Sequence, residues 1–166
     1  MYAATRARLA VILDVPRPDD RVSLWFDRVL ITLILVNVVA VVLESVAALH
    51  ARWSAAFHLI EVVSVSVFTV EYLLRVWAIV DNPWKPEYAA PVRGRLRFMR
   101  SPMAVIDLLA VLPFWLSMFI PLDLRFLRLV RLLRVLKLTR YSGAANLLFE
   151  VMREEARVLG AALFML

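Results

Sequence analysis

The sequence contains no cysteine, only three glycines and only two histidines in 166 residues. Without cysteine the chain forms no disulfide, thiolate metal site or cysteine nucleophile. No glycine-rich phosphate loop, Walker-type sequence or nucleophile elbow occurs in it. His50 and His58 are eight residues apart and have no acidic partner in a recognisable metal pattern. We therefore expect neither an enzyme nor a protein that holds a metal or cofactor.

Hydrophobic residues make up 63% of the chain, which is well above the share in soluble domains. A helix that crosses a bilayer of about 30 Å needs roughly 20 mostly apolar residues, and four such runs are present. We predict an all-α membrane protein whose residues 24–141 form an antiparallel four-helix transmembrane bundle. The predicted helices cover about residues 24–49, 54–80, 102–120 and 122–141.

The segments on either side of this bundle read as surface helices. Residues 1–23 contain a short apolar patch, then prolines and acids, and lack a signal-peptide cleavage site, so we predict a cytoplasmic interfacial segment. Residues 142–166 begin with apolar positions at helical spacing opposite charged ones, which predicts an amphipathic linker helix. From Val158 onward all residues but one glycine are apolar, so we expect a fifth membrane segment to begin there.

The chain has 20 basic and 14 acidic residues, and the position of the basic ones predicts its orientation. Those in the connections concentrate before the first run and between the second and third. By the positive-inside rule, both termini then lie in the cytoplasm of a multi-pass cell-membrane protein. Three prolines break the connection 81–101, which suits a path at headgroup level. The basic residues concerned are Arg6, Arg8, Arg17, Arg21, Lys85, Arg93, Arg95, Arg97 and Arg100.

The fourth run contains the stretch RFLRLVRLLRVLKLTR, with a positive charge at every third position. Charges at this spacing spiral slowly around an α-helix but align on one face of a 3₁₀-helix. Either geometry requires acidic or aqueous surroundings along the path of the charges. The six residues are Arg125, Arg128, Arg131, Arg134, Lys137 and Arg140.

Acidic residues of the other three runs can supply these surroundings. Counting 1.5 Å per residue, we expect Glu71 and Asp107 at one level in the inner part of the membrane. Glu44 and Glu61 are expected at a second level nearer the outer side. Phe68 precedes Glu71 by three residues and should lie between the two levels, where its ring would keep water from running through the bundle.

Charges at this depth indicate a function, because ionisable groups within membrane segments are costly. Moving one elementary charge through the membrane potential is worth about 2.3 kcal/mol per 100 mV. Arginine suits such a movement because it stays charged at every depth and pairs with successive carboxylates. We predict that the fourth helix moves outward on depolarisation and inward at a negative-inside potential.

Two further polar residues lie in the predicted helices. Arg75 is expected to anchor the second helix at the inner interface by extending to the headgroups. Asn37, in the middle of the first helix, is expected to form a hydrogen bond with either a neighbouring side chain or water.

Four motifs, in this order, resemble the voltage-sensor domain of voltage-gated potassium channels. The resemblance covers nearly the whole chain from the first run onward, and its bacterial members are the expected type. The motifs are VVLES at Glu44, EVVSVSVFTVEYLLR around Phe68, AVIDLLAVLPFWL around Asp107 and Pro113, and the basic stretch ending in LKLTRYS.

This resemblance implies a role for each matching residue. The gating charges would be Arg125, Arg128, Arg131, Arg134, Lys137 and Arg140. The charge-transfer centre would be Phe68, Glu71 and Asp107, and the outer acidic cluster Glu44 and Glu61.

The chain departs from that family in having no pore segments and no Thr-Val-Gly-Tyr-Gly filter. We expect it to be the sensor portion of a longer channel, a homotetramer at full length and a monomer as an isolated domain. The expected partners are the lipid bilayer with its anionic headgroups and the pore domain, with potassium bound only in the missing pore. Nucleic acid is not expected, because Leu and Val flank the arginines.

Three alternatives remain at this point. A voltage-gated proton channel has the same four helices, but it usually carries an acid where this chain has Asn37 and has fewer basic repeats. The second alternative is a sensor repeat of another voltage-gated cation channel. A non-sensing membrane scaffold is the third, and it predicts that neutralising Arg128 or Arg131 leaves voltage responses unchanged.

Overall fold

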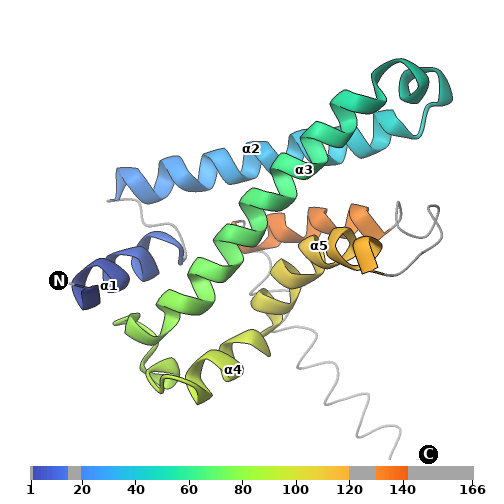
Figure 1. Ribbon diagram of the computed structural model, residues 1–166. Helices are drawn as coiled ribbons and strands as arrows, with labels where there is room; N and C mark the ends of the chain where they lie inside the picture. Colours follow the sequence, from blue (N-terminus) through green and yellow to red (C-terminus); the bar gives the residue numbers. More distant parts are fainter. Residues whose placement is uncertain (1, 15–19, 120–129, 142–166) are drawn as a thin grey trace, which may run out of the picture.

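The computed structural model describes residues 2–14, 20–119 and 130–141, which form helices joined by turns (Figure 1). The predicted linker helix and two of the basic residues, Arg125 and Arg128, lie outside the described residues. The α-helices are α1 (Tyr2–Ile12), α2 (Arg21–Glu44), α3 (Ala47–Ala78), α4 (Arg93–Met99) and α5 (Pro102–Phe119). The 3₁₀-helices are η1 (Ile79–Asp81), η2 (Pro86–Tyr88) and η3 (Leu133–Arg140).

Three of these helices, α2, α3 together with η1, and α5, are long and apolar enough to cross a membrane. They correspond to the first three predicted runs. No strand occurs in the described part of the chain. The predicted fold class, an all-α membrane protein, is confirmed.

A tight turn joins α2 to α3. The backbone N–H and the hydroxyl of Ser45 both donate to the carbonyl of Val42, at 3.2 and 2.6 Å, and α3 begins two residues later at Ala47. The turn lies earlier than the boundary between the predicted ranges 24–49 and 54–80. Only Glu44 and Ser45 interrupt the apolar residues there, so hydropathy alone does not mark the point where local hydrogen bonds end the helix.

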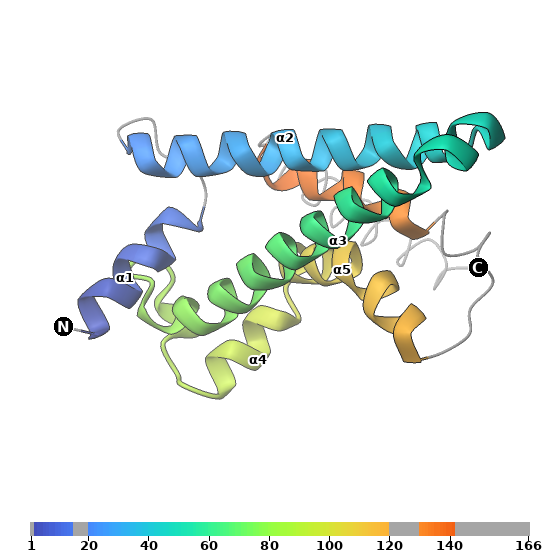
Figure 2. The same ribbon diagram turned by 45° about the horizontal axis from the view of Figure 1, so that its top comes forward.

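The helices α2, α3, α5 and η3 pack in a ring, each against two others. In Figure 2, η3 (orange) runs along α2, while α3 crosses between α2 and α5. Five almost inaccessible side chains fill the centre of this bundle, and burying apolar side chains of this size is worth about 1.5–3 kcal/mol each. They are Leu30, Ile34, Val65, Phe68 and Val111.

The short helices gather at one end of the bundle, where α1 packs against α3 and η1 (Figure 1). Asp14, just after α1, accepts hydrogen bonds from Asn82 at 2.9 Å and Lys85 at 2.7 Å. Arg6 forms an ion pair with Asp81. These contacts tie the N-terminal segment to the connection between α3 and α5.

Gly94 lies directly against the backbone of Tyr88, where a Cβ atom would be 2.0 Å from the Tyr88 carbonyl oxygen. Because backbone cannot move aside as a flexible side chain can, Gly94→Ala should separate α4 from η2. We expect the free energy of unfolding to fall by about 1–3 kcal/mol. Thermal unfolding in detergent tests this, with the exposed Glu87→Ala as control. Equal melting temperatures for the two variants would contradict it.

Candidate functional site

The basic residues of η3 lie on one face of the helix. Residues 130–132 are α-helical, and Leu133–Arg140 has 3₁₀ geometry, with about three residues per turn. Charges three residues apart therefore align, which decides between the two geometries for this part of the fourth run. Arg134 and Lys137 are completely enclosed, with 0% of either residue exposed. Buried charges are tolerated only with polar partners, and these form two groups.

The first group, the Glu61 cluster, comprises Arg131, Arg134, Glu44, Glu61 and Asn37. Arg131 Nε is 3.0 Å from Glu61 Oε1, and Arg131 Nη1 is 3.8 Å from Glu44 Oε2. Arg134 Nη2 is 3.2 Å from the same Glu61 oxygen, and its Nη1 donates to Asn37 Oδ1 at 2.7 Å. Two cations thus share one carboxylate, and the Asn37 amide supplies an additional neutral acceptor.

The second group, the Asp107 cluster, comprises Lys137, Arg140, Arg75, Glu71 and Asp107. Lys137 donates a hydrogen bond to Glu71 and its Nζ lies 3.9 Å from Asp107 Oδ1. Arg140 donates to Asp107. The two acids that were expected at one level therefore contact the same lysine.

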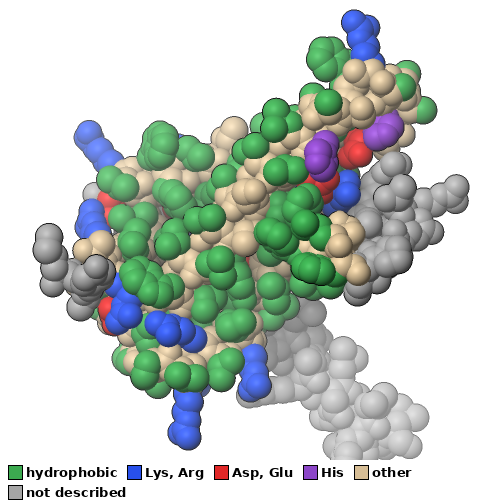
Figure 3. Space-filling model, in the orientation of Figure 1, with side chains coloured by type: hydrophobic (Ala, Val, Ile, Leu, Met, Phe, Trp, Pro, Cys, Tyr) green, Lys and Arg blue, Asp and Glu red, His purple; other side chains and the backbone are tan. Residues whose placement is uncertain are grey.

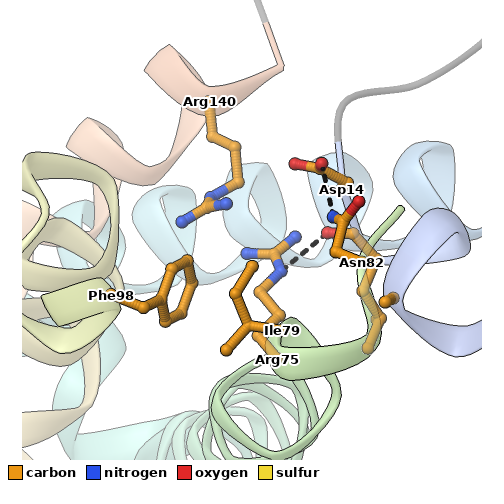
Figure 4. Close-up of a pocket in the computed structure, with 8 residues that line it drawn as sticks. Asp14, Arg75, Ile79, Asn82, Phe98 and Arg140 are labelled. Atoms are coloured by element: carbon orange, nitrogen blue, oxygen red, sulfur yellow. Dashed lines mark hydrogen bonds between the residues drawn. The ribbon is translucent and has the colours of Figure 1, made fainter. Parts of the chain in front are cut away.

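Arg75 belongs to this buried cluster, and its expected role as a headgroup anchor is wrong. Only 4% of the residue is exposed, and its guanidinium lies 2.7 Å from Glu71 and 3.0 Å from Asp107. Its Nε donates to the carbonyl of Leu13 at 2.9 Å (Figure 4). The end of α1 covers this position, a contact that the sequence pattern did not predict. The spacing of four residues from Glu71 is a signal that could have indicated the ion pair, but it was not used in the prediction.

Phe68 is completely buried between the two clusters. On α3 it lies seven residues after Glu61 and three before Glu71. Lys137 Nζ is 4.2 Å from the centre of its ring, a distance typical of a cation–π contact. On its other sides the ring packs into the apolar core of the bundle. A thin hydrophobic layer therefore separates the two charged groups.

A cavity of about 360 Å³ opens beside the Glu61 cluster. Its lining includes Glu44, Glu61, Arg131, His50 and His58, and Figure 3 shows histidine and acidic side chains gathered near the α2–α3 turn. His50 Nδ1 lies 3.7 Å from Glu44 Oε1. Among the described residues, no three His, Cys, Asp or Glu side chains are placed to hold a metal ion. The cavity gives this cluster a polar opening.

Asn37 is a member of the site that the sequence motifs do not predict. Asn37→Val keeps the volume but leaves Arg134 Nη1 without its acceptor, while Arg134 Nε still donates to the Ala110 carbonyl at 3.0 Å. We expect the free energy of unfolding to fall by about 1–3 kcal/mol. Ser66→Ala is the control, since that exposed hydroxyl bonds only within its own helix. Equal thermal stability of both variants would contradict the prediction.

The fold and these clusters define a class of protein: a helical membrane protein with paired charges buried between its helices. Residues 23–166 match the family of ion transport proteins, and the chain belongs to this family. It is a segment related to voltage-gated potassium channels, as the sequence motifs predicted.

Two relatives show this relation. A Rhodopseudomonas palustris protein, provisionally named as potassium channel protein RPA4233, is 32% identical over 166 residues, covering 99% of this chain and 40% of the relative. The human A-type voltage-gated potassium channel KCND3 is 33% identical over 121 residues, covering 69% of this chain and 16% of that channel. The chain therefore spans well under half the length of these relatives.

Proposed function

We propose that this chain senses membrane voltage by displacement of its fourth helix and so gates a potassium-selective pore in the parent channel. One observation carries the proposal: Arg134 and Lys137 are enclosed on one face of a 3₁₀-helix, with acids on both sides of Phe68. A merely structural ion pair does not require a row of cations at a constant spacing. A helix whose cations exchange acidic partners in steps does require such a row.

The proposed orientation has both termini in the cytoplasm, with the Glu61 cluster toward the outside and the Asp107 cluster toward the inside. Arg131 and Arg134 then lie on the outer side of Phe68, and Lys137 contacts the ring. This arrangement corresponds to an outward position of the fourth helix, which depolarisation favours.

The proposed movement proceeds in steps of three residues. At about 2.0 Å per residue in a 3₁₀-helix, an inward shift of about 6 Å would bring Arg134 to the place of Lys137 beside Phe68. The 3₁₀ geometry keeps successive cations on one face, so the helix can translate without rotating. Each charge that crosses the full potential contributes about 2.3 kcal/mol per 100 mV. A few charges suffice to switch a two-state protein.

The proposed roles follow the predicted ones. Phe68, Glu71 and Asp107 form the charge-transfer centre, and Glu44 and Glu61 the outer acidic cluster. Arg125 and Arg128, outside the described residues, are proposed as additional gating charges. Family membership favours ion transport over catalysis. We propose that the parent channel is a homotetramer joined through its pore domain. We also propose that anionic lipid headgroups contact the basic surface of α4.

Voltage-clamp recording of the protein in a bilayer with a transmembrane pH gradient tests the proposal. We expect a transient displacement of charge that saturates with voltage, without a steady proton current. A sustained current that reverses at the proton equilibrium potential would instead show that the four helices conduct protons. Absence of any charge displacement would support a non-sensing scaffold.

A further inference from the structure

Asp27 is a buried carboxylate that none of the expected roles includes. It lies near the start of α2, only 4% of it is exposed, and neither side-chain oxygen has a hydrogen-bond partner in the described structure. Leaving a buried carboxylate without a partner is costly, so such a group calls for an explanation.

The position of Asp27 relates it to the path of the fourth helix. Asp27 shares the buried face of α2 with Asn37, which accepts a hydrogen bond from Arg134. Asp27 lies ten residues before Asn37, or about 15 Å further along the bundle. On η3, Arg140 lies six residues after Arg134, or about 12 Å in the same direction. Asp27 is therefore about 3 Å beyond the level of Arg140.

The charged groups that act electrostatically on Asp27 are, in order of decreasing effect, Arg75, Glu71 and Arg140. Arg75 is already engaged on α3: its Nε donates to the Leu13 carbonyl, its Nη1 donates to Asp107, and its Nη2 forms an ion pair with Glu71 at 2.7 Å without a hydrogen bond among the described residues. Arg140 is attached to the helix proposed to move. Its guanidinium points into the small pocket between Arg75 and Phe98 (Figure 4).

The charge balance of this region supports the same assignment. The Asp107 cluster contains three cations, Arg75, Lys137 and Arg140, but only two acids, Glu71 and Asp107. When Asp27 is included, the region contains three acids for its three cations. In the position seen here, the third acid is close to the cations but hydrogen-bonds none of them.

We propose that Asp27 is the acceptor for Arg140 when the fourth helix moves inward, a third acidic station after the Glu61 and Asp107 clusters. This inference rests on the proposed voltage-sensing function. In the outward position Arg140 pairs with Asp107. An inward step of about 6 Å carries Arg140 from just above the level of Asp27 to just below it, within reach of its carboxylate. Asp27 thereby stabilises the inward position.

Gating-charge recordings of the protein test the assignment. Asp27→Asn keeps the shape but removes the charge, so the ratio of outward to inward molecules at a fixed potential should rise about tenfold, the scale of one charge-assisted hydrogen bond. The charge–voltage curve then moves to more negative potentials. In the Arg140→Gln background the same change should have at most half of this effect.

The control is Asp20→Asn, which removes an acid at the same end of α2 but retains an N-cap residue. If Asp27→Asn behaves like this control, moves the curve to positive potentials, or acts equally in the Arg140→Gln background, the proposal is overturned. If the wild-type protein displaces no charge at all, the proposed voltage-sensing function is itself refuted, and the role of Asp27 falls with it.

A second measurement does not depend on the folding of Asp27→Asn. Because the chain has no cysteine, the pair Asp27→Cys and Arg140→Cys introduces the only thiols. A disulfide requires the two Cα atoms to be about 4.4–6.8 Å apart. We expect oxidation to cross-link the pair faster at negative-inside than at depolarised potentials. A rate independent of potential, or faster on depolarisation, would overturn the proposal.

Discussion

Glu71→Gln is expected to lower the free energy of unfolding by about 3–5 kcal/mol, the usual cost of breaking a buried ion pair. Glu71 is 2% exposed, accepts a hydrogen bond from Lys137 and lies 2.7 Å from Arg75. Without the charge of Glu71, the one anionic partner left to Lys137 among the described residues would be Asp107, at 3.9 Å. Thermal unfolding of the detergent-solubilised protein measures the effect.

Two variants make this experiment specific. Glu87→Gln removes an acid from the exposed helix η2 and should leave the melting temperature nearly unchanged. The double variant Glu71→Gln, Lys137→Met should regain part of the lost stability, because it leaves no unpaired lysine in the bundle. If Glu71→Gln is as stable as Glu87→Gln, the buried pair contributes nothing to stability and the assigned geometry of the Asp107 cluster is refuted.

Arg134→Gln is expected to reduce the saturating gating charge by up to about one elementary charge per chain. Arg134 is fully buried on the outer side of Phe68, so in the proposed movement it crosses the hydrophobic layer. Glutamine retains a polar group for Asn37 and Glu61, which limits the structural damage. The measurement is the charge displaced at saturating voltages, normalised to the amount of protein in the membrane.

Arg97→Gln is the matched control for this prediction, since it neutralises an exposed arginine of α4 that is not part of the row of cations on the fourth helix. It should leave the saturating charge unchanged. An equal charge in wild type and Arg134→Gln would show that this residue does not traverse the field. The fourth helix would then be a static element, as the scaffold hypothesis holds.

The helices were predictable because their cause is local. A run of about 20 apolar residues has few alternatives to a membrane helix, so three of the predicted segments match α2, α3 and α5. The shared level of Glu71 and Asp107 followed from the fixed rise per residue. Their contact with one lysine agrees with that reasoning.

Contacts between distant segments were not predictable in the same way. Arg75 was assigned to the headgroups because the sequence does not reveal that the end of α1 covers it and that Leu13 supplies an acceptor. The partner of Asn37 was left open because a mid-membrane amide can bond to water or to a side chain. Only packing places Arg134 beside it.

By itself, the sequence determined the helical membrane class, the constant spacing of the cations and the approximate depth of the acids, because these depend on residue type and helix geometry alone. Tertiary structure decided the 3₁₀ form of Leu133–Arg140 and the pairing of each cation. It also left Asp27 without a hydrogen-bond partner among the residues that the structure describes. These features depend on which helix faces meet, and in a bundle this is settled by packing and by the need of every buried charge for a partner.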